Sequence, residues 1–214
     1  MENLKRNYQK ELEKQLASLE REGTAPTLLL HACCAPCSSY VLEYLSRFFS
    51  IVLFNYNPNI SPESEFHKRE AEIRRLLREM PLARPVELVS GAYDPERFFA
   101  IAKGHEQEPE GGARCEACYR LRLEEAARAA REHGCDFFTT TLSISPYKNA
   151  EKLNAIGAEL AETYGVPYLF SDFKKRNGYK RSIELSRTYQ LYRQDYCGCV
   201  FSRAEAARRT AEPR

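Results

Sequence analysis

Short apolar segments alternate with helical patterns along most of this 214-residue chain. The strand candidates are 27–31, 51–55, 86–89, 136–140 and 166–170, and the amphipathic stretches lie at about 3–22, 38–48, 63–79, 95–103, 115–133, 149–164, 181–193 and 202–210. Strands separated by helices of this length are typical of βαβ units. Because such crossovers are right-handed, we predict an α/β fold with one doubly wound, Rossmann-like parallel sheet of about five strands. For the strand order we assume 3-2-1-4-5, which the sequence pattern does not itself determine.

The length of the chain suits one globular core rather than two. We predict a single domain over residues 1–214, with 1–23 as a helical N-terminal extension and 174–214 as a basic helical cap of the same domain. No apolar run is long enough to span a bilayer, and the first 22 residues have no signal-peptide core. We therefore expect a cytoplasmic protein that does not act at a membrane.

Eight cysteines give the strongest chemical signal, because seven of them are grouped. The groups are Cys33, Cys34 and Cys37 in HACCAPC, Cys115 and Cys118 in RCEAC, and Cys197 and Cys199 in YCGC. Disulfide frameworks are typical of small secreted chains, so grouped thiols here favour metal binding or redox chemistry. Cys135 stands alone before a predicted strand, and we expect it to be a small buried apolar side chain.

The predicted topology brings the grouped thiols toward one edge of the sheet. Cys33, Cys34 and Cys37 follow the first strand, and the stretch TTTLSISPY follows the fourth. In the predicted order these two strands are neighbours at the switch point, where ligands bind in open α/β sheets. Cys115 and Cys118 begin the helix that returns to the fourth strand, whereas topology constrains Cys197 and Cys199 less. The acidic segment 104–113, which leads into Cys115, is expected to be a flexible connector.

The spacing of the cysteines narrows the choice of metal. A Cys-x-x-Cys pair suits zinc or an iron–sulfur cluster, but adjacent cysteines such as Cys33 and Cys34 fit one tetrahedral zinc poorly, because successive side chains diverge. The spacing therefore favours a 4Fe–4S cluster over zinc. Cys37, Cys197 and Cys199 remain for a further iron, or Cys197 and Cys199 could form an easily reduced disulfide.

Charge is distributed unevenly along the chain. Residues 174–214 hold eleven Lys and Arg against four Asp and Glu, although the whole chain carries a net charge of only +2. Tyr179, Tyr189, Tyr192 and Tyr196 are interleaved with these cations. Cations neutralise phosphates and aromatic rings stack on unpaired bases, so this segment suits a nucleic-acid surface. The alternative is a solvated helix face with core tyrosines.

Six motifs together resemble one known family. HACCAPCS, FNYNPNI, RCEACYRLRL, DFFTTTLSISPYKN, DFKKRNGYKRSIELS and YRQDYCGCVFS occur in this order between about residues 31 and 202. They resemble the cobalamin-independent epoxyqueuosine reductases of the QueH type. The resemblance implies a tRNA-modifying oxidoreductase that removes the epoxide oxygen of epoxyqueuosine at the wobble position, giving queuosine and water. The tRNAs implied are those for aspartate, asparagine, histidine and tyrosine.

The resemblance also implies roles for the cysteines. Cys33, Cys34, Cys115 and Cys118 match the ligands of a 4Fe–4S cluster. Cys197 and Cys199 match a pair described both as a redox-active disulfide and as ligands of an additional iron, and Cys37 falls where a third ligand of that iron can stand. The implied enzyme uses no cobalamin and takes its electrons from a donor such as a ferredoxin or flavodoxin.

Further residues are candidates by their placement. Tyr147, Lys148 and His31 could donate a proton, and Asp172 could contact substrate or orient another group, with a core histidine and a surface helix cap as the alternatives. For the substrate pocket we predict Asn57, Asn59, Thr140, Thr141 and Ser143, although turn formation explains the asparagines equally well. For the tRNA-binding surface we predict Arg176, Tyr179, Lys180, Arg181, Arg187, Tyr189 and Arg193.

Two other functions remain open on the sequence. The cysteines could be structural zinc ligands of a non-catalytic RNA-binding protein, or Cys197-Gly198-Cys199 could serve a thiol–disulfide oxidoreductase. An iron–sulfur protein differs from both in containing iron and acid-labile sulfide.

Overall fold

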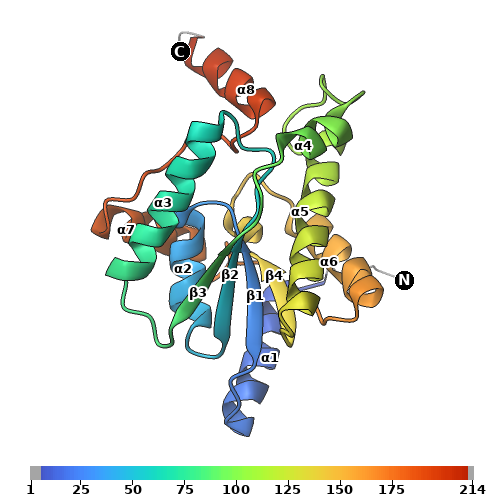
Figure 1. Cartoon of the computed structure of the whole chain (residues 1–214). Helices are drawn as coiled ribbons and strands as arrows, with labels where there is room; N and C mark the ends of the chain where they lie inside the picture. The colour runs from blue at the N-terminus through green and yellow to red at the C-terminus, as the bar shows by residue number, and fades with distance from the viewer. Residues whose placement is uncertain (1–5, 212–214) are drawn as a thin grey trace.

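The computed structural model describes residues 6–211, and its centre is a parallel sheet of four strands (Figure 1). The strands are β1 (Thr27–Ala32), β2 (Ser50–Asn55), β3 (Val86–Ser90) and β4 (Phe137–Thr140). Their order is β3-β2-β1-β4, with Leu29 of β1 opposite Val52 of β2 and Phe138 of β4. The predicted α/β class and the order of these four strands are confirmed. Residues 1–5 and 212–214 of the predicted extension and cap lie outside the described residues.

The fifth predicted strand is reduced to one isolated bridge. Tyr168 pairs in parallel with Phe138, so the segment lies beside β4 as the predicted order requires. The backbone N–H of Phe138 donates to the carbonyl of Pro167 at 3.0 Å, and that of Leu169 donates to Phe138 at 2.9 Å. Pro167 has no N–H to donate and β4 is only four residues long, so the pairing does not extend.

Helices cover both faces of the sheet (Figure 1). Three of them pack their apolar residues on one face: α1 (Tyr8–Glu22), α2 (Ala35–Leu45) and α3 (Glu63–Glu79). The other face is covered by α5 (Ala113–Glu132) and α6 (Ala150–Tyr164). The remaining elements are α4 (Pro95–Ala102), the 3-10 helix η1 (Thr141–Ile144), α7 (Gly178–Thr188), which packs on α2, and α8 (Val200–Ala211).

The sheet divides the apolar interior into two cores. Leu28 and Leu30 of β1 point into the core under α1, α2 and α3, whereas Leu29 points into the core under α5 and α6. Successive side chains of a strand face opposite sides, and a parallel sheet is buried on both. Cys135 lies in the second core at 6% exposure, as expected for an apolar cysteine. No described helix is both long and apolar enough to cross a bilayer.

Local capping sets where the helices begin and end. The helix predicted from residue 3 begins at Tyr8, because the Asn7 side chain accepts a hydrogen bond from the Lys10 N–H at 3.0 Å. The helix predicted over 181–193 spans Gly178–Thr188 instead. The chain turns out of it through Gln190, whose φ of 48° lies in the left-handed region, and residues 189–199 form a connector that leads to Cys197 and Cys199.

We propose that α1 belongs to the same folding unit as the sheet, since Leu12, Leu16 and Leu19 lie in its first core. Replacing Leu16, which is 3% exposed, by alanine is expected to lower the free energy of unfolding by about 2–5 kcal/mol. The control is Lys14→Ala on the exposed side of α1, expected to change it by less than about 0.5 kcal/mol. Urea unfolding measures both, and equal midpoints for the two variants would contradict the proposal.

Candidate functional site

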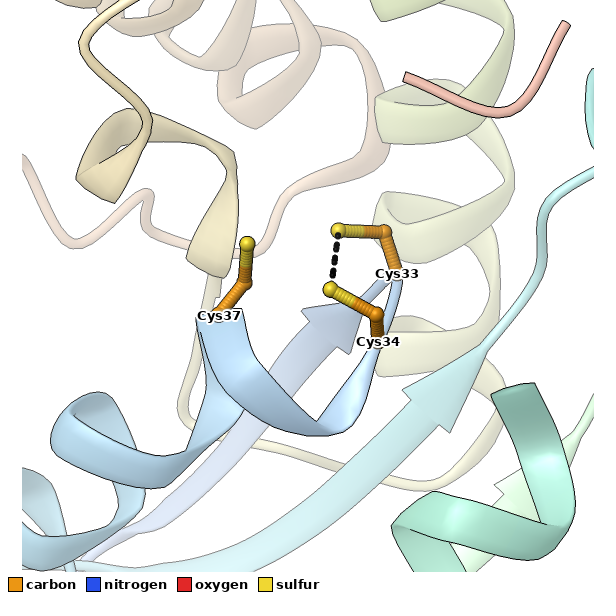
Figure 2. A group of neighbouring side chains, drawn as sticks. All are labelled: Cys33, Cys34 and Cys37. Carbon is orange, nitrogen blue, oxygen red and sulfur yellow. Dashed lines mark hydrogen bonds between the residues drawn. The ribbon is translucent and has the colours of Figure 1, made fainter. Parts of the chain in front are cut away.

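Three thiols converge where β1 ends and α2 begins (Figure 2). Cys34 is the extended N-cap residue of α2, Cys33 precedes it, and Cys37 lies in the first turn. Their sulfur atoms lie within 4.8 Å of one another, and the Cys33 and Cys34 sulfurs are 3.8 Å apart. The partial positive charge at the N-terminus of α2 favours thiolates here. This group can hold a metal ion.

The three thiols differ in pKa, because they form hydrogen bonds with one another. Hydrogen bonds from Cys34 and Cys37 hold the pKa of Cys33 well below its usual range. The same hydrogen bond to Cys33 raises the pKa of Cys34 to about 12, and bonds to both neighbours raise the pKa of Cys37 well above its usual range. One thiol of the three therefore ionises readily. A bound cation would favour the thiolate form of the other two.

The other four predicted cysteines form a second group. Cys115 and Cys118, in the first turns of α5, line a small cavity of about 20 Å³ together with Cys197 and Cys199. Cys197 also lines a larger cavity of about 270 Å³ whose wall includes Cys33, Cys34 and Cys37. We call these the small cavity and the main cavity. The seven grouped thiols therefore form two adjoining sets that share Cys197, and all are free thiols.

Arg69 of α3 fixes the segment Cys197-Gly198-Cys199. Its guanidinium donates to the carbonyl of Cys197 at 3.0 Å, and the backbone N–H of Ser61 donates to the carbonyl of Gly198 at 3.0 Å. Gly198 has a φ of 127°, and a Cβ there would lie 3.0 Å from the Arg69 guanidinium. Glycine is therefore the residue that permits this close approach. The position of this segment could not be predicted from the order of strands and helices, because it depends on a hydrogen bond from the Arg69 side chain.

Buried positive charge surrounds the thiols. Arg69, Arg122 and Lys148 are only 2%, 1% and 9% exposed. Arg69 pairs with Glu65 at 2.7 Å, whereas Arg122 and Lys148 have no carboxylate within ion-pair distance among the described residues. One guanidinium nitrogen of Arg69 and the Nε of Arg122 are buried without a hydrogen-bond partner. Because buried charges need counter-charges, this donor set fits a metal centre whose thiolates make it anionic.

The thiols in turn keep these cations charged. Burial lowers the pKa of Arg122, but Cys118, Cys33 and Cys197 oppose it, so that the pKa is raised overall. Burial also lowers the pKa of Lys148, which the thiols of Cys197, Cys33 and Cys37 together with Tyr119 raise above its usual range. The Lys148 ammonium therefore remains protonated at neutral pH. Its charge and its thiol neighbours stabilise each other.

Arg69 and Arg122 were not predicted from the sequence as site residues. Helical arginines usually lie at the surface, and nothing in α3 marked Arg69 as buried. Arg122 carried a usable signal, since it follows Cys115 and Cys118 at helical spacing in RCEACYRLRL and so shares their face of α5.

The three proton-donor candidates lie in different environments in the structure. Lys148 and Tyr147 both line the main cavity, and Tyr147 is 68% exposed. His31 is fully buried, with its ring nitrogens 2.9 Å from the Thr140 hydroxyl and 3.0 Å from the Tyr56 carbonyl. Burial lowers the pKa of His31 to about 3, so it is a neutral core histidine. The structure thus favours the core alternative for His31.

Asp172 lies outside the main cavity. It lines a separate side cavity of about 470 Å³ with Arg6 and Lys175, and its carboxylate pairs with Lys174 at 2.6 Å. Lys148 lines both the side cavity and the main cavity. Asp172 and the thiols therefore line different cavities.

The predicted pocket residues are buried, and none of them lines the main cavity. Asn57 is fully buried, donates to the carbonyl at the end of β1 and accepts from Arg122. Thr140 caps η1, while Thr141 and Ser143 are 0% and 1% exposed. Asn59 lines the small cavity, and its carbonyl oxygen has no hydrogen-bond partner. In place of the predicted hydroxyls, Leu142, Ile144 and Ser145 line the main cavity.

The predicted tRNA-binding residues lie in different settings. Tyr179 and Arg193 line the main cavity. Arg176 pairs with Glu13, Arg181 pairs with Glu43 and Glu184, and Tyr189 packs against the first core. Lys180 and Arg187 are exposed on α7. Tyr196, noted in the sequence as one of the tyrosines of the basic segment, also lines the main cavity. Glu110 and Arg209 line it too and were not predicted, because they come from a loop and a helix distant along the chain.

Comparisons with known proteins point to one family. A sequence model described as "Epoxyqueuosine reductase QueH" matches residues 28–205. A curated protein of that name from Staphylococcus epidermidis is 45% identical over 206 residues, covering 94% of this chain and 87% of the relative. Relatives of the same name from Streptococcus pyogenes and Thermotoga maritima are 41% and 36% identical, covering 94% and 87% of this chain and 79% and 95% of their own lengths.

These matches span all the elements that carry the cysteines, and they confirm the family resemblance of the six motifs. The chain therefore belongs to the epoxyqueuosine reductase QueH family.

Proposed function

We propose that this protein reduces epoxyqueuosine at the wobble position of tRNA to queuosine. The observation that carries the proposal is the main cavity, whose wall holds the thiols of Cys33, Cys34, Cys37 and Cys197 and whose lining includes Tyr147, Tyr179 and Tyr196. Thiols that can hold a redox-active metal and rings that can stack on a base line the same space. The names of the curated relatives support the same activity.

The cysteines would hold the metal centre. We propose that Cys33, Cys34, Cys115 and Cys118 ligate a 4Fe–4S cluster, and that Cys37, Cys197 and Cys199 ligate an additional iron. When bound, such a centre supplies single electrons and a Lewis acid for the epoxide oxygen. Arg122 supports this arrangement, because it is within electrostatic reach of Cys33, Cys118 and Cys197, thiols of both sets. No cobalamin is needed for this chemistry.

Lys148 is the proposed proton donor. Converting the epoxide to an alkene and water consumes two electrons and two protons, and the oxygen leaves more easily once protonated. Lys148 lines the main cavity beside the thiols and has no hydrogen-bond partner for its ammonium among the described residues. Tyr147, at 68% exposure, is better placed to stack on a base at the opening.

The opening of the main cavity suits an anticodon loop. Arg193 and Arg209 line it with the tyrosines, and both arginines are exposed. Unpaired bases stack on aromatic side chains while arginines contact the flanking phosphates. We propose that the tRNAs for aspartate, asparagine, histidine and tyrosine bind here, and that an external donor such as a ferredoxin or flavodoxin supplies the electrons.

Metal content tests the iron–sulfur proposal. Anaerobically purified protein is expected to contain about four to five irons and about four acid-labile sulfides per chain, since a cubane has four of each. Cys34→Ser is expected to lose most of the iron. Cys135→Ser, which changes a buried cysteine outside both cavities, is the matched control and should retain it. One zinc and no sulfide in the unchanged protein would instead support the structural-zinc alternative.

The role of Lys148 is tested by two substitutions. Lys148→Met should lower kcat for epoxyqueuosine-tRNA by about 100-fold or more, the usual contribution of a general acid. Lys148→Arg keeps the positive charge but replaces the compact ammonium by a planar guanidinium that presents its protons at different positions, so its kcat should also fall. The kcat of each variant is measured after its iron content and its affinity for tRNA have been shown to equal those of the unchanged protein. Full activity of Lys148→Arg would show that charge alone is required.

The tRNA surface is tested by the salt dependence of binding. Arg193→Gln with Arg209→Gln should weaken tRNA binding about tenfold and reduce the slope of log K against log salt by about 0.7 for each lost phosphate contact. The control pair is Arg120→Gln with Arg128→Gln, two arginines of α5 that pair with glutamates outside both cavities. An unchanged slope in the first pair would remove these two arginines from the surface.

A further inference from the structure

The main cavity contains an unpaired carboxylate close to the thiols. Four of its lining residues are cationic, namely Arg69, Lys148, Arg193 and Arg209, and only Glu110 and Asp195 are acidic. Glu110 is half-buried, whereas Asp195 is exposed. Neither carboxylate makes a hydrogen bond or ion pair with any described residue. A half-buried carboxylate left unpaired in this way is available to a cationic ligand.

Glu110 lies where the two cavities meet. It lines both the main cavity and the small cavity, a property shared only with Cys197 among their described lining residues. Asp195, in contrast, lines the main cavity alone. Glu110 therefore borders both the space lined by Cys33, Cys34 and Cys37 and the space lined by Cys115, Cys118 and Cys199.

The loop that carries Glu110 is held in place. Arg114, at 2% exposure, donates hydrogen bonds to the carbonyls of His105, Glu106 and Glu108. The Arg114 guanidinium also packs over the ring of Phe201 in α8, 4.4 Å from its centre. This segment was expected to be a flexible connector, but a buried arginine fastens it to α5 and α8. The position of Glu110 is thus built into the fold.

The proposed substrate carries a group that such a carboxylate would bind. In epoxyqueuosine a secondary amine joins the five-membered epoxide ring to the base, and alkylamines are protonated at neutral pH. If the base stacks among the tyrosines and the epoxide reaches the thiols, the amine lies between them. We propose that Glu110 binds this alkylammonium and so selects the modified nucleotide over guanosine. The inference rests on the proposed function.

Binding can be measured without turnover, because queuosine retains the amine but has no epoxide. The probes are one tRNA carrying queuosine at the wobble position and the same tRNA carrying guanosine, titrated with anaerobically purified, metal-containing protein. The unchanged protein is expected to prefer the queuosine form about tenfold, the value of one charge-assisted hydrogen bond. Glu110→Gln should reduce the preference to about twofold or less, with unchanged affinity for the guanosine form and unchanged iron content.

Asp195→Asn is the matched control, since it removes the same charge from the exposed part of the cavity, and it should keep the preference. A preference that survives in Glu110→Gln, or is lost equally in Asp195→Asn, would overturn the assignment. So would loss of iron from Glu110→Gln, which would make Glu110 a metal ligand. Failure of the proposed function looks different: the unchanged protein would then neither prefer queuosine-tRNA nor reduce epoxyqueuosine-tRNA.

Discussion

Buried positive charge among thiols is the interaction on which the rest of the site depends. Arg122 and Lys148 are held inside the protein with no carboxylate of the described residues within ion-pair distance, and an uncompensated buried ion costs several kcal/mol. The thiols remove that cost only as thiolates, and a thiol buried without a cation keeps its proton. Cations and cysteines therefore require each other. The proposed metal centre is the simplest way to satisfy both, because metal binding deprotonates its cysteine ligands.

The topology delivers these groups to one place. The sheet order changes direction at β1, so the chain leaves β1 through Cys33 and Cys34 and later leaves β4 toward Lys148 beside them. The start of α5 then brings Cys118 and Arg122 to the same end of the sheet. Only Cys197-Gly198-Cys199 lacks a strand to position it. The position of that segment depends instead on Arg69, which donates a hydrogen bond to its backbone.

Periodicity and spacing were enough to predict the four strands and the grouping of the thiols, because these depend on regular patterns, whereas the order of the strands was an assumption that the structure confirms. The fifth predicted strand forms only one bridge, because Pro167 has no N–H to donate to the neighbouring strand. The apolar composition of the segment does not show this local effect. The buried arginines and Glu110 were missed for a different reason. Charged residues usually lie at the surface, and their burial here depends on contacts between segments far apart in the chain.

The two cavities divide the proposed work between them. The small cavity, at about 20 Å³, has no room for a nucleoside, so we assign Cys115 and Cys118 to the proposed metal centre and not to contact with substrate. The main cavity, at about 270 Å³, has that room and exposes Cys33, Cys37 and Cys197 to whatever enters. Cys197 and Glu110 belong to both. On the proposed function, the cluster would span this boundary, with Cys115 and Cys118 on the side of the small cavity and Cys33 and Cys34 on the side of the main cavity, where Lys148 supplies the proton.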